Sequence, residues 1–169
     1  LKHRGVRDLA YMGGGSALGH GRPLALAAMV GLASAVMSCG EGDGVAPEIA
    51  MMRALGSLEY RSEWASGGSA QLTDGVYTEP AAPGSASELS VRLTRWSCVD
   101  DLNGDGKPDC AAVLVTDPGG SGTFHDLVAV VHTKTGPKHV ATAALGDRVH
   151  VEAPRASNGW VSVDLHEPP

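Results

Sequence analysis

The sequence predicts a mainly β (α+β) fold, an antiparallel β-meander sheet of about six to seven strands with a short N-terminal helix packed on it. Turn-forming pairs such as Asp74-Gly75, Asn103-Gly104 and Asn158-Gly159 separate short apolar stretches, and such punctuation favours hairpins over helices. Several of these stretches alternate polar and apolar residues, which is typical of a strand with one buried face and one face in water. Only one segment carries clear helix signals.

That segment, Pro47 to Leu58, is the predicted helix. A proline and a glutamate open it, and Ile49, Met52 and Leu55 recur at helical spacing. Proline is favoured in the first turn, and apolar residues three positions apart lie on one side of a helix. We therefore expect this helix to cover one face of the sheet.

Two apolar stretches are continuous rather than alternating: Ala111 to Val115 and Leu127 to Val131. Strands that are covered on both faces have this pattern, so we expect these two to be central. The predicted strands are Ala70 to Leu72 with Val76-Tyr77, Leu89 to Trp96, Ala111 to Thr116, Asp126 to His132, His139 to Ala144, Arg148 to Glu152 and Trp160 to Leu165.

Residues 1–38 have the layout of an export signal, with Met12 as an alternative start. A polar stretch precedes the apolar run from Leu24 to Met37, which has about the length of a secretory signal's apolar region and falls short of the ~20 residues that a membrane-spanning helix needs. The stretch that ends at Cys39 resembles a bacterial lipobox. This resemblance implies a lipid on Cys39 and the membrane as a partner.

The chain accordingly divides into a signal peptide (1–38), a flexible tether (39–46) and a single β-rich domain (47–169). Loss of residues 1–38 removes four of the 13 basic residues and one of the 19 acidic ones, which leaves a net charge of −9. An acidic chain without a basic run is a poor match for sequence-independent nucleic-acid binding, which depends on neutralising phosphates. We expect the protein to be exported to the bacterial cell envelope and to have no nucleic-acid partner.

The segment from Asp101 to Asp109 has the composition of a calcium-binding loop. Oxygen-bearing side chains stand at positions 1, 3, 5 and 9, and Gly106 at position 6 permits a sharp turn. An EF-hand is excluded because Ala112 stands where its bidentate glutamate would be. The alternative is a plain hairpin turn with a solvated acidic tip. The predicted Ca²⁺ ligands are Asp101, Asn103, Asp105, the Lys107 carbonyl and Asp109.

The stretch DLNGDGKPDCAAVLV resembles the DxNxDGxxD loops of integrin-type FG-GAP repeats and related bacterial surface repeats, in which a strand follows directly. The resemblance implies a calcium site at those same positions. It occurs once in the chain, so it does not imply a propeller. The wider region from Tyr60 to Leu165 looks like a small β domain that recurs in exported bacterial proteins of unassigned function.

Cys98 and Cys110 flank the loop. If Cys39 carries a lipid, these two remain as a pair, and in an oxidising compartment we expect them to form a disulfide. A bridge that closes about a dozen residues contributes ~3 kcal/mol in the chain-entropy model.

Catalytic and other binding motifs are weaker. Ser121, His125 and Asp126 could meet only by chance, because Ser121 lacks the strand–elbow–helix context of a nucleophile, and no HxH or HExxH spacing suggests zinc. Trp64 and the other two tryptophans form a sugar-stacking platform only if they share a face. The sequence therefore predicts an exported, lipid-anchored protein with a structural calcium loop and a non-catalytic binding role. The alternative is a cell-wall hydrolase or hydrolase inhibitor acting through residues 118–124.

Overall fold

The computed structural model describes the backbone of residues 4–10 and the full residues 46–157 and 159–166. Cys39, the tether before residue 46 and the predicted signal peptide from residue 11 to residue 38 lie outside the described residues. Within the described part, none of the helices combines the length and the apolarity needed to cross a membrane.

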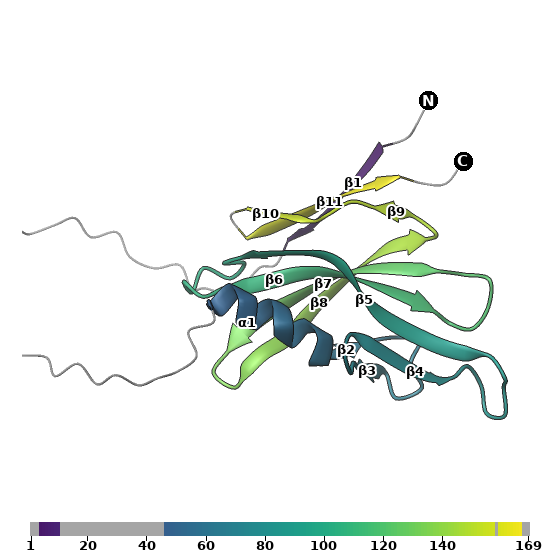
Figure 1. The fold of residues 1–169 in the computed structure, drawn as a ribbon. Helices are drawn as coiled ribbons and strands as arrows, with labels where there is room; N and C mark the ends of the chain where they lie inside the picture. Colours follow the sequence, from purple (N-terminus) through teal and green to yellow (C-terminus); the bar gives the residue numbers. More distant parts are fainter. Residues whose placement is uncertain (1–3, 11–45, 158, 167–169) are drawn as a thin grey trace, which may run out of the picture.

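A five-stranded antiparallel sheet forms the middle of the molecule (Figure 1). Its strands follow one another along the chain in a meander, and β6 and β7 lie in the interior of the order, as predicted. The strands are β4 (Val76–Pro80), β5 (Glu88–Asp100), β6 (Asp109–Asp117), β7 (Phe124–Thr133) and β8 (Gly136–Asp147).

One face of this sheet is covered by the N-terminal helical segment. The helix α1 (Pro47–Ala54) continues into a 3₁₀ turn, η1 (Leu55–Ser57), and the hairpin of β2 (Glu59–Arg61) and β3 (Ser69–Gln71) follows. Met51 and Leu55 pack into a buried cluster with residues of β5, β6 and β7. The buried Tyr60 hydroxyl donates a hydrogen bond of 2.9 Å to the carbonyl of Leu55, which ties the hairpin to the turn.

The other face is covered by a second, smaller sheet. Its central strand is β11 (Trp160–His166), which pairs with β1 (Arg4–Ala10) on one side and with β10 (Arg155–Ser157) and β9 (His150–Val151). Figure 1 shows this sheet lying across the middle one, on the side away from α1. The molecule therefore has three layers. The strands β1, β2 and β10 are not among those that the sequence predicts.

The two faces of β6 explain why its apolar run is continuous. Successive side chains of a strand point to opposite faces, so Cys110, Ala112 and Leu114 belong to the cluster beneath α1. Ala111 and Val113 belong to the cluster beneath the second sheet. The prediction of a mainly β fold with a short helix packed on the sheet is confirmed.

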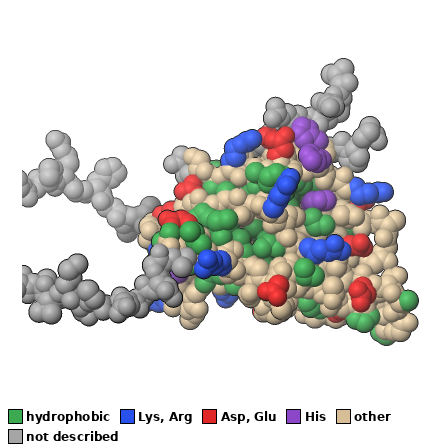
Figure 2. All heavy atoms as spheres, in the orientation of Figure 1, with side chains coloured by type: hydrophobic (Ala, Val, Ile, Leu, Met, Phe, Trp, Pro, Cys, Tyr) green, Lys and Arg blue, Asp and Glu red, His purple; other side chains and the backbone are tan. Residues whose placement is uncertain are grey.

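The buried side of α1 differs from the expected one. Met51 and Leu55 are each 2% exposed, whereas Ile49 and Met52 are 47% and 49% exposed. Figure 2 shows hydrophobic side chains gathered over this helix, among interspersed charges of both signs. The helical period was read correctly, but the side of the helix that faces the sheet was not.

Candidate metal centre

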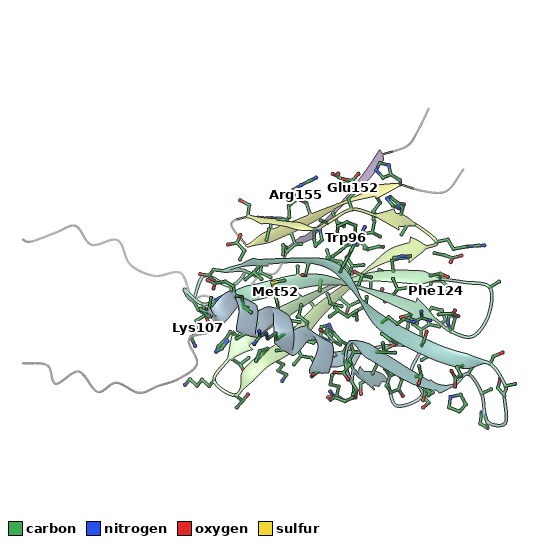
Figure 3. All side chains as sticks on the ribbon, viewed as in Figure 1. Met52, Trp96, Lys107, Phe124, Glu152 and Arg155 are labelled. Atoms are coloured by element: carbon green, nitrogen blue, oxygen red, sulfur yellow. The ribbon has the colours of Figure 1, made fainter. Side chains whose placement is uncertain are left out.

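The predicted calcium loop is the hairpin connection between β5 and β6. β5 ends at Asp100 and β6 begins at Asp109, so residues 101–108 form the turn. Gly104 and Gly106 have φ values of 78° and 79°, a left-handed conformation that glycine adopts without steric cost. In Figure 3, Lys107 marks this turn at the end of the molecule where α1 begins.

The carboxylate of Asp101 organises the turn. Its Oδ1 accepts hydrogen bonds from the backbone N–H of Gly104 at 2.7 Å and of Asp105 at 3.1 Å, and its Oδ2 accepts one from Gly106 at 2.8 Å. These N–H groups, the one of Gly106 above all, lower the pKa of Asp101 because they stabilise the charged carboxylate. The turn is therefore built around a single negative charge.

Asn103 and Asp105 continue the same pattern of acceptors. Asn103 Oδ1 accepts from the N–H of Asp105 at 2.9 Å, and Asp105 Oδ1 accepts from the N–H of Lys107 at 2.9 Å. Asp105 and Lys107 are exposed, while Asp101 and Asn103 are half-buried. Each carboxylate or amide oxygen has two lone pairs, so these side chains retain acceptor capacity after making these bonds.

Asp109 has a different position from the other predicted ligands. It is completely buried, and both of its oxygens are occupied by backbone donors. Oδ2 accepts from the N–H of Leu102 at 3.1 Å, and Oδ1 accepts from the N–H of His132 at 2.8 Å. Burial raises the pKa of Asp109 in spite of these bonds. Asp109 therefore connects the loop to the end of β7.

The donor set fits Ca²⁺ in chemistry but only partly in arrangement. All predicted ligands offer oxygen, which this hard cation prefers. However, no group of three or more His, Cys, Asp or Glu side chains in residues 46–157 and 159–166 is arranged to hold a metal ion. The side chains of Asp101, Asn103 and Asp105, none of which is completely buried, and the Lys107 carbonyl are the part of the loop that could hold one.

The predicted disulfide is absent, and Cys98 and Cys110 are both free thiols. In the register of β5 and β6, Cys98 stands opposite Ala111 and Cys110 stands opposite Val99. Directly opposed residues share a face, so the two thiols point to opposite faces of the sheet. Burial raises the pKa of both thiols, that of Cys110 to about 12.

The Ser121, His125 and Asp126 side chains are not assembled into a triad. His125 and Asp126 are successive residues of β7, so they point to opposite faces. Ser121 is exposed, and the buried Nδ1 of His125 has no hydrogen-bond partner in the described structure. The 118–124 loop instead packs on the β4–β5 turn, where a Cβ on Gly119 would lie 2.8 Å from the Cβ of Ala81.

The three tryptophans do not form one platform. Trp64 packs against the cluster beneath α1 and stacks on Phe124 with ring centroids 4.4 Å apart. Trp96 packs against the opposite cluster and carries the guanidinium of Arg95 over its ring at 4.3 Å. Trp160 is 57% exposed.

A hollow of about 540 Å³, which no sequence pattern predicts, lies between the 61–68 segment and β8. His139 stands at its wall, where Nδ1 accepts from the N–H of Arg61 at 3.2 Å and Nε2 lies 3.0 Å from the carbonyl of Ala141. The neutral tautomer with its hydrogen on Nε2 satisfies both contacts, and burial lowers the pKa of His139. Burial, with a contribution from Glu63, raises the pKa of Asp126 in the same hollow.

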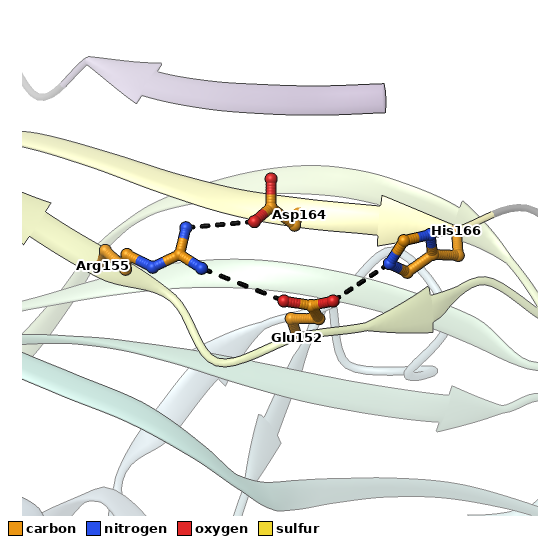
Figure 4. Close-up of polar contacts among 4 residues, drawn as sticks. All are labelled: Glu152, Arg155, Asp164 and His166. Atoms are coloured by element: carbon orange, nitrogen blue, oxygen red, sulfur yellow. Dashed lines mark hydrogen bonds and ion pairs between the residues drawn. The ribbon is translucent and has the colours of Figure 1, made fainter. Parts of the chain in front are cut away.

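A network of charged side chains was also missed, on the exposed face of the second sheet (Figure 4). Arg155 Nη1 lies 3.0 Å from Asp164 Oδ2, and its Nη2 lies 3.9 Å from Glu152 Oε2. His166 Nε2 lies 3.0 Å from Glu152 Oε1. Glu152 and Arg155 are three residues apart, but Asp164 and His166 join them only through the pairing of β11 with its neighbours, which no sequence signal predicts.

Comparison with known proteins finds no family model, no curated protein and no solved structure that matches the chain.

Proposed function

We propose that the chain is an exported bacterial envelope protein, anchored by a lipid on Cys39, whose β domain has a structural calcium site and a non-catalytic binding role. The polar stretch, the apolar run and the small residues before Cys39 support export and lipid attachment. The calcium loop would then face the periplasm or the exterior of the cell.

One observation carries the calcium part of the proposal: the turn is organised around the Asp101 carboxylate. Three backbone N–H groups donate hydrogen bonds to that carboxylate. The same turn contains Asn103 and Asp105, whose side-chain oxygens are further possible metal ligands. A bound Ca²⁺ would supply positive charge among these oxygens. Because the turn joins β5 to β6, and Asp109 joins it to β7, an ion here would act on the stability of the central sheet.

The hollow beside β8 supports the binding role. Arg61, His139, Asp126 and Trp64 are among the residues that line this open depression of about 540 Å³. Such a mixture of hydrogen-bonding groups and an aromatic ring suits a polar envelope component.

Thermal unfolding tests the calcium site. We expect the Tm in Ca²⁺ to exceed that in EGTA by about 10 °C, since ligand at a hundred times its Kd stabilises by ~2.7 kcal/mol. Asp105→Ala should give the EGTA value in both buffers. Glu88→Ala, an exposed acid outside the loop, should keep the full difference. Identical melting curves of the unaltered protein in the two buffers would reject the site.

Terbium luminescence gives a readout independent of stability. Tb³⁺ replaces Ca²⁺ at oxygen sites and is sensitised by a nearby indole. Trp160 is near the loop, because a Cβ added to its neighbour Gly159 would lie 3.1 Å from the carbonyl oxygen of Leu102. We expect tryptophan-sensitised Tb³⁺ emission that Ca²⁺ competes away and that Trp160→Phe reduces. Export and lipid attachment are tested by the intact mass of protein taken from bacterial membranes. We expect a mass that corresponds to cleavage before Cys39 and an added diacylglycerol.

A further inference from the structure

The outer edge of β11 is occupied by the N-terminal strand of the chain. β1 pairs antiparallel with β11 over seven residues, from Arg4 opposite His166 to Ala10 opposite Trp160. In Figure 4, β1 runs beside β11 on the side away from the residues of β9 and β10. Every residue of β11 has a partner on this edge.

β11 is held in place by contacts that do not involve β1. Its inward side chains Val161, Val163 and Leu165 are 1%, 1% and 5% exposed, and they belong to the cluster that includes Val113 and Leu127 of the central sheet. On its other edge β11 pairs with β9 and β10. Loss of β1 therefore leaves β11 fixed, with the backbone N–H and C=O groups of one edge unpaired.

This situation arises if the chain is processed as proposed above, so the inference rests on that function. Cleavage before Cys39 removes residues 4–10 together with the rest of the signal peptide. An exposed strand edge is a template for another strand, because unpaired backbone groups gain hydrogen bonds by pairing. The remaining question is which strand takes the place of β1.

We propose that a second copy of the same domain takes it, through antiparallel pairing of β11 with β11 about a twofold axis at Val163. In that register Ser162 stands opposite Asp164 of the second copy, and Val161 stands opposite Leu165 of the second copy. In the chain itself, Ser162 stands opposite Asp8 and Val161 opposite Leu9. The Asp-Leu pair of β1 thus occupies the register positions that the Asp-Leu pair of a second β11 would take.

The charges on β11 permit this pairing. No like charges stand directly opposite one another, because Asp164 faces a serine and His166 faces Trp160. The carboxylate of Asp164 already has a partner on its own domain, since Arg155 Nη1 lies 3.0 Å away. A twofold interface uses the same patch on both copies, as most protein dimers do.

The full-length chain tests the proposal without any cleavage. Val6→Pro/Arg7→Pro removes two successive backbone N–H groups of β1, at least one of which points toward β11 in a pleated strand. We expect light scattering to report a doubled mass for this variant, while the unaltered chain stays monomeric. Val6→Ala/Arg7→Ala keeps the backbone donors and should remain monomeric.

A third substitution assigns the new contact to β11. Ser162→Asp in the proline variant places one new carboxylate opposite each Asp164 across the axis, and the two resulting like-charge pairs should weaken association about tenfold. Ser162→Asn, similar in size and neutral, should leave the dimer intact. Hydrogen exchange of the β11 amides should stay slow in the dimer.

A proline variant that is monomeric would overturn the proposal, as would a dimer that Ser162→Asp does not weaken. Neither result touches the proposed function, because the variant chains retain residues 1–38. An uncleaved Cys39 in membrane-derived protein would reject export processing, whatever the mass of the proline variant.

Discussion

At the scale of single residues, Asp109 is the side chain whose role the structure changes most. The sequence pattern predicts it as the last calcium ligand. In the structure it is completely buried and accepts hydrogen bonds from the N–H groups of Leu102 and His132. A buried donor without an acceptor costs about 1–3 kcal/mol, so this carboxylate matters for stability with or without a metal.

We therefore expect Asp109→Ala to lower the free energy of unfolding in EGTA by about 2–5 kcal/mol, because the buried N–H of Leu102 and the partly buried N–H of His132 lose their acceptor. Asp105→Ala, which alters an exposed acid of the same loop, should change it by less than about 0.5 kcal/mol in EGTA. Urea denaturation followed by circular dichroism measures both. Equal effects of the two substitutions would contradict the structural role of Asp109.

His139 is a second residue whose effect depends on burial, and it makes stability depend on pH. Burial lowers its pKa in the folded protein, whereas in the unfolded chain the pKa is the ordinary value of about 6.5. Below pH 6.5, His139 therefore binds more protons in the unfolded chain than in the folded protein. The contribution of His139 is complete above pH 6.5 and declines as the pH falls below that value.

We expect the Tm to fall as the pH is lowered from 7.5 to 5.5, and His139→Gln to reduce the fall. The same protonation would break the contact between the N–H of Arg61 and Nδ1, since a charged imidazole offers no acceptor. Differential scanning calorimetry across this pH range measures the effect. A steeper pH dependence in the glutamine variant would show that the sign is wrong.

At the scale of elements, α1 illustrates how a correct period can be assigned to the wrong face. Ile49, Met52 and Leu55 share a helical spacing, but the helix buries Met51 together with Leu55. Its short length leaves only two turns, and both Met51 and Met52 are apolar. Only the packing of α1 against β5 and β6 decides between them.

Two adjacent methionines therefore give a matched comparison. Met51→Ala should destabilise by about 2–5 kcal/mol, because it leaves a cavity beneath the helix. Met52→Ala should change stability by less than about 0.5 kcal/mol, because its side chain is half-exposed. Guanidinium denaturation measures both. Comparable losses of stability would contradict the finding that α1 buries Met51 and exposes Met52.

The strands show the same division between what the sequence predicts and what pairing decides. The continuous apolar runs of β6 and β7 predicted central strands, because both faces of each are covered. The disulfide between Cys98 and Cys110 does not form in the structure, because the register of β5 and β6 directs the two thiols to opposite faces of the sheet. β5 also carries an irregularity between Leu93 and Ser97, and nothing in the alternating sequence predicts it.

At the scale of the whole molecule, the sequence predicted the mainly β class and the meander, because turn residues and apolar runs are local signals. It did not predict that β9, β10 and β11 leave the meander to form a separate layer. Their alternation is the same as that of a half-buried strand in one continuous sheet. The calcium loop, which depends on local spacing, remains a prediction that the binding experiments decide.

The three-layer arrangement also has a consequence for the order of folding. The cluster beneath the second sheet includes Val161, Val163 and Leu165 of the last described strand, so it cannot close until β11 has been synthesised. Before that, one face of β6 and β7 has no cover. If the chain is exported as proposed above, this late closure would help to keep it unfolded while it passes through a narrow export channel.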